Sequence, residues 1–161
     1  MKKLQLSEWA AIGELIGTAA VIISLLFLAY SVGQNTEAVR GATENLLFER
    51  HGALQNNLIS DASLADLYAR IQAGETQLSA VEEVRWRTYQ TNMLDVWEIA
   101  YMRNAGGLLG EREWRNWNSY FSQMFSHGAE QLSESDWRSL AYAYDAGFWT
   151  HVGKSLGYDP G

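Results

Sequence analysis

The three histidines are the residues of this 161-residue chain best suited to acid–base or metal chemistry. His51, His127 and His151 all lack the E-x-x-H or H-E-x-x-H spacing with which one helix supplies two metal ligands. Glu49 stands two residues before His51, and on a helix their side chains point about 200° apart, so they form no acid–base pair. A metal site would need side chains that converge from different helices, and we expect no metal and no cofactor.

Motifs for nucleophilic catalysis and phosphate binding are also missing from the sequence. It contains no cysteine, which excludes disulfides, thiolate metal sites and cysteine nucleophiles. It contains no G-x-S-x-G pattern, and Gly153-Lys154-Ser155 lacks the upstream glycine and the preceding strand of a phosphate-binding loop. We therefore predict no catalytic residue and a protein that is not an enzyme. A membrane-anchored enzyme or small-ligand binder is the alternative.

The elements that would position any site are predicted to be helices. The single proline is Pro160, so none interrupts the interior helices, and alternating strand patterns are scarce. The net charge is -7, and the acidic excess falls after residue 36. Because nucleic-acid phosphates require clustered Lys and Arg, this charge argues against nucleic acid as a partner.

A segment of 22 residues without charge, from Leu15 to Thr36, is the strongest feature of the sequence. Its first 18 residues would form a helix of about 27 Å, close to the ~30 Å hydrocarbon core of a bilayer. Trp9 and Tyr30 would lie about 31 Å apart, at the two interfaces where amphipathic rings concentrate. We predict an all-α protein in which one transmembrane helix continues into a small aromatic-rich bundle. Its divisions are an interfacial flank at 1–9, a transmembrane helix at 10–32 and an extramembrane helical domain at 33–161.

Two other interpretations of the apolar segment stay open. Ala29-Tyr30-Ser31 has small residues at the alternate positions that a signal peptidase prefers. Glu8 and Glu14, however, separate the positively charged start from the apolar run, unlike a signal peptide. A buried helix at the core of a soluble oligomer is the other possibility. We expect a retained span.

Small residues line one side of the predicted span. Gly13, Gly17, Ala20 and Ser24 follow one another at steps of four, three and four, so they share a helix face. Such a stripe lets a second helix approach closely, and we predict helix packing there. Glu14 lies beside the stripe, at a depth where a carboxylate needs a partner, water or a proton. It is either an interfacial residue or, in an oligomer, a functional carboxylate near the mouth of a channel.

Helix signals continue after the span. Leu47, His51, Leu54 and Leu58 recur at helical spacing and predict a partly apolar face. Asp61 is predicted to cap a further helix. The sequence Ser79-Ala80-Val81-Glu82 predicts a capping box that begins another.

Aromatic residues at helical spacing mark three later segments, Trp86 to Tyr101, Trp114 to Phe125 and Trp137 to Phe148. Because each ring can bury about 150–250 Å², we expect them to form the core of a small bundle. A site for a chromophore or quinone, or an aromatic cage, is the alternative. Three rings fall off the Trp137 stripe and are expected to face a partner or lipid headgroups: Tyr142, Trp149 and Tyr158.

The chain also resembles a known group at its N-terminus. The pattern that carries the resemblance is Trp9, Ile12-Gly13-Glu14, Gly17, Ser24-Leu25-Leu26, Tyr30 and Gln34-Asn35-Thr36. It is similar to that of a widespread group of uncharacterised bacterial single-span membrane proteins with a helical domain after the span. The resemblance covers residues 9–45, and the segment from Ser133 departs from it. It implies a bacterial membrane setting, and no activity or ligand.

Together these features predict a non-catalytic, membrane-anchored protein that acts by association in the bacterial inner membrane. The expected partners are the lipid bilayer and either a second copy of the chain or other membrane-protein subunits, for which it would be an accessory or scaffold. A channel is the further alternative. Lys2 and Lys3 nearly balance Arg40 and Arg50 across the span, with a slight preference for a cytoplasmic N-terminus.

Overall fold

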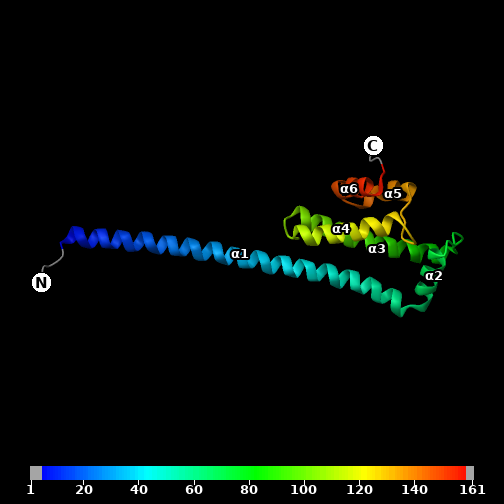
Figure 1. Ribbon diagram of the computed structural model, residues 1–161, viewed down its shortest axis with the longest axis horizontal. Helices are drawn as coiled ribbons and strands as arrows, with labels where there is room; N and C mark the ends of the chain where they lie inside the picture. Colours follow the sequence, from blue (N-terminus) through cyan, green and yellow to red (C-terminus); the bar gives the residue numbers. More distant parts are fainter. Residues whose placement is uncertain (1–4, 159–161) are drawn as a thin grey trace. The chain divides into compact units, whose positions relative to one another are not determined.

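The computed structural model describes residues 5–158, with the backbone alone at Glu8. The predicted all-α fold is confirmed, and the described residues contain no strand. The helices, shown in Figure 1, are α1 (Leu6–Ser60), α2 (Ala62–Gln72), α3 (Ala80–Ala105), α4 (Glu111–Ser126), α5 (Glu134–Leu140), the 3-10 turn η1 (Ala141–Ala143) and α6 (Ala146–Leu156). Lys2, Lys3 and Pro160 lie outside the described residues.

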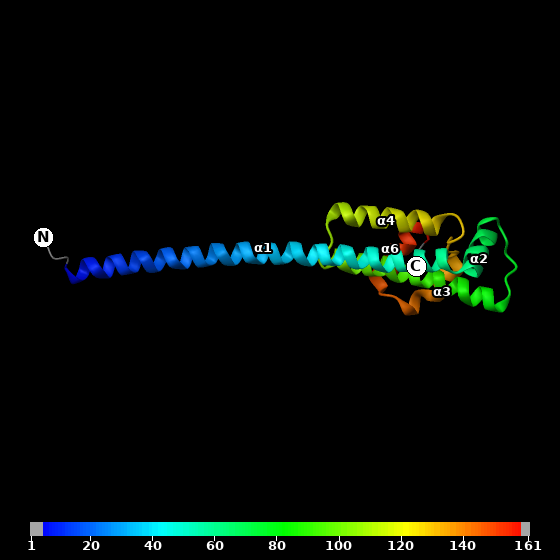
Figure 2. The same cartoon turned by 90° about the horizontal axis from the view of Figure 1, so that it is seen from below.

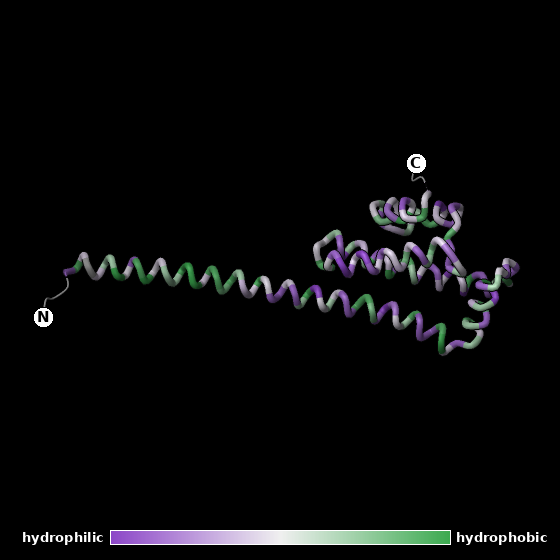
Figure 3. Tube along the Cα trace, in the orientation of Figure 1, coloured by the Kyte–Doolittle hydropathy of each residue, from purple (hydrophilic) through white to green (hydrophobic). Residues whose placement is uncertain are grey.

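The chain divides into two compact units, Met1–Val39 and Arg40–Gly161, and α1 runs through the boundary between them. In the first unit α1 is apolar over a long stretch, coloured green in Figure 3, and polar residues return farther along the helix. This stretch is long and apolar enough to cross a membrane, and none of its 18-residue window is buried. The predicted continuation of the helix beyond the apolar segment is confirmed. The membrane limits at 10–32 stay a prediction.

Side-chain caps fix the starts of α2 and α3. The Asp61 carboxylate accepts hydrogen bonds from the backbone N–H groups of Ser63 at 3.0 Å and Leu64 at 3.1 Å. The Ser79 hydroxyl accepts from the N–H of Glu82 at 3.4 Å, and the Glu82 carboxylate accepts from the N–H of Ser79 at 2.8 Å. Both predicted caps are confirmed, because each satisfies N–H groups that have no partner inside the helix.

The core of the second unit forms around α3, which packs against α2, α4 and α6. Figures 1 and 2 show α3 and α4 running side by side. Trp97 of α3 is fully buried, and its ring stacks on Phe121 and Phe125 of α4 at centroid distances of 5.8 and 5.9 Å. Phe148 of α6 meets the same ring edge-on at 5.8 Å. The predicted aromatic core is confirmed, and most of the aromatic residues that suggested a ligand site are packed in it.

The last part of α1 also belongs to this core. Leu47 is fully buried, and Leu54 and Leu58 pack against the same cluster. His51 lies among them with its side chain half-buried. The apolar face predicted from their spacing is confirmed.

The segment from Trp137 to Phe148 is not one helix, contrary to the prediction from its aromatic spacing. After α5 and η1, Tyr144 has an extended backbone with φ -122° and ψ 161°. Asp145 then begins α6, and its carboxylate accepts a hydrogen bond from the N–H of Phe148 at 3.0 Å. The side chain of Asp145 replaces the backbone acceptor that a continuous helix would supply, which allows the chain to turn.

This turn also changes which aromatic residues are buried. Trp149 is 5% exposed and stacks on Tyr144 at 4.8 Å, so the prediction that it faces a partner is wrong. Its Nε1 donates to the carbonyl of Trp137 at 3.0 Å, and the Nε1 of Trp137 donates to the carbonyl of Trp149 at 3.3 Å. Tyr158 is also packed against the core, and its hydroxyl donates to a backbone carbonyl at 2.5 Å. Tyr142 is the exposed member of the three, at 90%.

Candidate functional site

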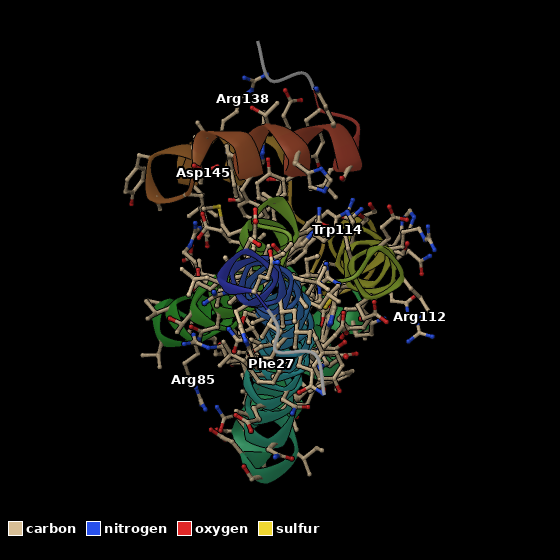
Figure 4. The ribbon with its side chains drawn as sticks, turned by 90° about the vertical axis from the view of Figure 1, so that its left-hand side faces the viewer. Phe27, Arg85, Arg112, Trp114, Arg138 and Asp145 are labelled. Atoms are coloured by element: carbon tan, nitrogen blue, oxygen red, sulfur yellow. The ribbon has the colours of Figure 1, made fainter. Side chains whose placement is uncertain are left out.

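The small residues of the predicted packing stripe are exposed on one face of α1. Gly13, Gly17, Ala20 and Ser24 are all exposed in the apolar part of the helix. Phe27, labelled in Figure 4, is also exposed in this part. Apart from the adjoining backbone of α1 itself, no atom of the described residues lies within 4 Å of the position that a Cβ would take at Gly13 or Gly17. The α1 backbone is therefore open to a neighbouring helix along this stripe.

Hydroxyl groups in the same stretch are satisfied inside the helix. Ser24 donates to the carbonyl of Ala20 at 2.8 Å, and Thr18 donates to the carbonyl of Glu14 at 2.9 Å. Because each hydroxyl proton has an acceptor four residues back, neither side chain needs a polar partner to lie in an apolar medium. The stripe thus presents small side chains, and its one hydroxyl donor, that of Ser24, is already engaged.

The predicted interfacial residues and Glu14 are also exposed. Trp9 is 59% and Tyr30 is 64% exposed, and the hydroxyl of Tyr30 accepts a hydrogen bond from Gln34 at 2.6 Å. Among the residues whose side chains the structure describes, none forms an ion pair with Glu14, and its role stays a prediction.

A groove of about 260 Å³ opens between α1 and α4 in the second unit. The Nε2 atom of His51 lies 2.9 Å from the hydroxyl of Tyr120, and its ring lies edge-on to Trp117 at 5.6 Å. Burial lowers the pKa of His51, so its ring is neutral at pH 7. The lining residues are Glu44, Phe48, His51, Glu113, Asn116, Trp117 and Tyr120.

A buried carboxylate in this unit lies near three tyrosines, one of which, Tyr120, also lines the groove. Glu130 is 7% exposed, and Tyr68 donates a hydrogen bond to it. Burial, and then the charge of Glu130, raises the pKa of Tyr68 to about 12 and also raises the pKa of Tyr89 and Tyr120. The hydroxyl of Tyr89 is buried without a hydrogen-bond partner among the described residues. All three phenols are protonated at neutral pH, so they can donate to an anion and cannot serve as bases.

His151 is held inside the aromatic core. Its Nε2 lies 2.6 Å from Oδ1 of Asn118, which also accepts from Nε1 of Trp97 at 3.1 Å. Burial, together with the nearby charge of Lys154, lowers the pKa of His151, so the ring is neutral and Nε2 carries its proton. Trp114, on the side of α4 toward α6 in Figure 4, lies 5.5 Å from the ring. His151 is thus a hydrogen-bonded core residue.

The histidines and acidic residues do not converge on a metal site. Among the described residues, no group of three His, Asp or Glu side chains is placed to hold a metal ion. The Gly153-Lys154-Ser155 segment lies inside α6, so it does not form a strand-to-helix phosphate loop. Gly153 has a packing role instead, because a Cβ there would lie 2.6 Å from the ring of Trp137.

Comparison with protein-family models, curated proteins and solved structures gives no match. The class of protein is therefore defined by the fold alone. It is an all-α chain with one long apolar helix, exposed and long enough to cross a membrane, followed by a helical bundle with an aromatic core. The resemblance to bacterial single-span proteins stays a prediction.

The groove between α1 and α4 was not predicted from the sequence. Its rings come from Phe48 in one helix and from Trp117 and Tyr120 in another, and no short motif joins them. One local signal was present, because Phe48 and Tyr120 each stand beside a predicted apolar face and yet are large aromatic residues. In the structure, the Phe48 side chain is 57% exposed and that of Tyr120 is 40% exposed.

Proposed function

We propose that this protein is a non-catalytic single-span protein of the bacterial inner membrane that acts by association. Residues 10–32 anchor it in the bilayer, and the stripe of Gly13, Gly17, Ala20 and Ser24 contacts either a second copy or a subunit of a larger membrane complex. The N-terminus lies in the cytoplasm, and the helical domain lies on the other side.

The observation that carries this proposal is the exposure of the most apolar part of α1. Leu15, Ile16 and Phe27 are 72%, 63% and 71% exposed, although burial of such a side chain contributes about 1.5–3 kcal/mol. A bilayer removes this surface from water, and an adjoining helix does so for the stripe. Ala29-Tyr30-Ser31 lies inside a continuous helix that reaches Ser60, which supports a retained segment.

Association through the stripe is tested by substituting Gly17. A Cβ at position 17 has open space around it, so we expect Gly17→Leu to block a neighbouring helix while the single chain keeps its fold. The matched control is Ala19→Leu, which adds a large side chain on the opposite face of α1. Each form is extracted in a mild detergent, and its mass is measured by light scattering together with any co-purifying chains.

The expected result is an assembly larger than one chain for the wild type and for Ala19→Leu. Gly17→Leu should weaken the association at least tenfold, because small residues at such an interface allow the close backbone approach. A wild type that is monomeric and free of partners would contradict the proposal. Equal effects of the two substitutions would exclude the stripe as the contact surface.

A further inference from the structure

The groove between α1 and α4 has aromatic walls. The ring of Phe48 lies 5.2 Å from that of Trp117, and the ring of Trp117 lies 6.4 Å from that of Tyr120 in an edge-on arrangement. Phe48 is 57% exposed and Tyr120 is 40% exposed, so both present surface to the groove. Trp117 is 8% exposed and stacks on Phe121 at 5.7 Å, so it forms the floor of the groove, and the exposed rings of Phe48 and Tyr120 offer the aromatic surface that can attract a positive charge.

Two carboxylates add negative charge to this space. Glu44 of α1 and Glu113 of α4 line the groove, and no Lys or Arg is among its lining residues. Arg112 pairs with Glu113 at 2.7 Å, but its side chain is 81% exposed and extends outward from α4 (Figure 4). Glu113 itself is 20% exposed and is also hydrogen-bonded to its own backbone N–H, so the negative charge that stays available in the groove is that of Glu44, which forms no ion pair with a described residue. The remaining polar ring, His51, is neutral at pH 7.

The lining also limits the kind of cation. An ammonium with N–H groups needs acceptors on several sides, whereas most of the surface that this lining exposes is apolar. A quaternary ammonium donates no hydrogen bond, and its methyl groups pack on aromatic faces. The volume of about 260 Å³ suits a headgroup-sized ligand, because sites for drug-sized molecules occupy about 300–1,000 Å³.

We propose that the groove formed by Phe48, Trp117 and Tyr120, with Glu44 and Glu113, is a binding site for a small quaternary ammonium cation of the choline type. Phe48 and Tyr120 flank the methylated nitrogen above the buried ring of Trp117, and Glu44, with Glu113 beside it, balances its charge. This site is independent of the association proposed for α1. Its ligand is either free in solution or the headgroup of a choline phospholipid.

The test uses the full chain in maltoside detergent and radiolabelled choline in equilibrium dialysis. Unlabelled tetramethylammonium and 3,3-dimethyl-1-butanol, the uncharged isostere of choline, are the competitors. Choline should bind saturably, tetramethylammonium should displace it, and the neutral isostere should be at least tenfold weaker. Equal competition by the isostere would overturn the proposal, because the groove would then bind apolar groups regardless of charge.

Two substitutions locate the site. Phe48→Leu keeps an apolar side chain but removes the ring, and Glu44→Gln removes one charge; each should weaken choline binding at least threefold. Their matched controls are Tyr142→Leu, which removes an exposed ring elsewhere, and Glu49→Gln, which removes a charge from α1 outside the groove. Circular dichroism checks that all four variants keep the wild-type fold. Equal losses in the variants and their controls, or no saturable binding to the wild type, would overturn the proposal.

The source of the cation is decided in lipid nanodiscs. If the groove takes a lipid headgroup, discs of phosphatidylcholine should lower the apparent affinity for added choline at least tenfold relative to discs of phosphatidylglycerol. If it takes a free cation, the affinity should be the same in both lipids. Both results require the choline binding already measured in detergent, and loss of binding in both kinds of disc would overturn the proposal.

Discussion

Arg70 connects three carboxylates that come from different parts of the second unit. Its guanidinium contacts Asp66 at 3.0 Å, Glu75 at 2.8 Å and Glu82. The side chain of Arg70 is 33% exposed, so water screens these pairs only in part. A single residue therefore joins α2, the following loop and the start of α3.

Glu82 makes this group of charges sensitive to acid. Hydrogen bonds from Ser79, and then the contact with Arg70, lower the pKa of Glu82 from 4.5 to about 2. A lowered pKa in the folded state means that the stabilisation is complete above pH 4.5 and is lost as the pH falls toward 2. Between these values, the wild type should lose more unfolding free energy than Glu82→Gln, which has no proton to bind there.

Urea unfolding of the full chain in detergent, followed by tryptophan fluorescence at several pH values, measures this difference. Glu83→Gln is the control, because Glu83 lies in the same helical turn and meets Arg87 only at 3.6 Å. Its curve should follow the wild type. Parallel curves for the wild type and Glu82→Gln would exclude the capping box as an acid-sensitive element.

At the scale of elements, α5 and α6 are held together by close contact between a glycine and a tryptophan. Gly153 is buried on α6, and a Cβ built there would lie 2.6 and 3.1 Å from two carbons of the Trp137 ring. Trp137 cannot move away easily, because its ring stacks on that of Trp149 and the indole N–H of each tryptophan donates a hydrogen bond to the backbone carbonyl of the other. The distance between these helices therefore depends on the missing side chain.

Gly153→Ala should lower the unfolding free energy by about 1–3 kcal/mol, the usual cost of overpacking a core. Gly52→Ala is the matched control, since Gly52 also lies inside a helix but has no atom within 4 Å of its Cβ position. That change should raise stability by about 0.5–1 kcal/mol through the better helix propensity of alanine. Urea denaturation of both variants checks the contrast, and equal shifts would contradict the packing role of Gly153.

At the scale of the whole molecule, the absence of native cysteine makes membrane orientation directly measurable. Tyr142 is 90% exposed in the helical domain, and Leu6 is 88% exposed before the apolar stretch. With the proposed cytoplasmic N-terminus, a membrane-impermeant maleimide should label Tyr142→Cys in spheroplasts and should leave Leu6→Cys unlabelled until lysis. The slight preference for a cytoplasmic N-terminus follows from the positive charges on the two sides of the span.

The reverse labelling pattern would place the helical domain in the cytoplasm and keep the single span. Labelling of both cysteines before lysis would contradict a span between them. Protein that leaves the membrane in alkaline carbonate would exclude an integral anchor altogether. The wild type, which has no thiol, controls for reaction at other groups.

Much of the fold was determined by short stretches of sequence. Asp61 and Ser79 each form their caps with residues two or three positions away, so the information lies within one turn of helix. The aromatic faces around Trp97 and Phe121 are likewise set by the 3.6-residue period, which aligns neighbouring turns. The apolar composition of α1 similarly predicted a helix long enough to span a bilayer.

Tertiary structure decided what local periodicity could not. The spacing around Tyr144 fits a continuous helix, but the Asp145 cap and the stacking of Tyr144 on Trp149 stabilise a turn there. The groove depends on how Phe48 of α1 lies along Trp117 of α4, and this register arises from contacts between residues far apart in the chain. The sequence by itself determined helices, caps and the apolar segment, because these depend on neighbours within a few residues. Only packing between helices decided which rings are buried and which enclose a site.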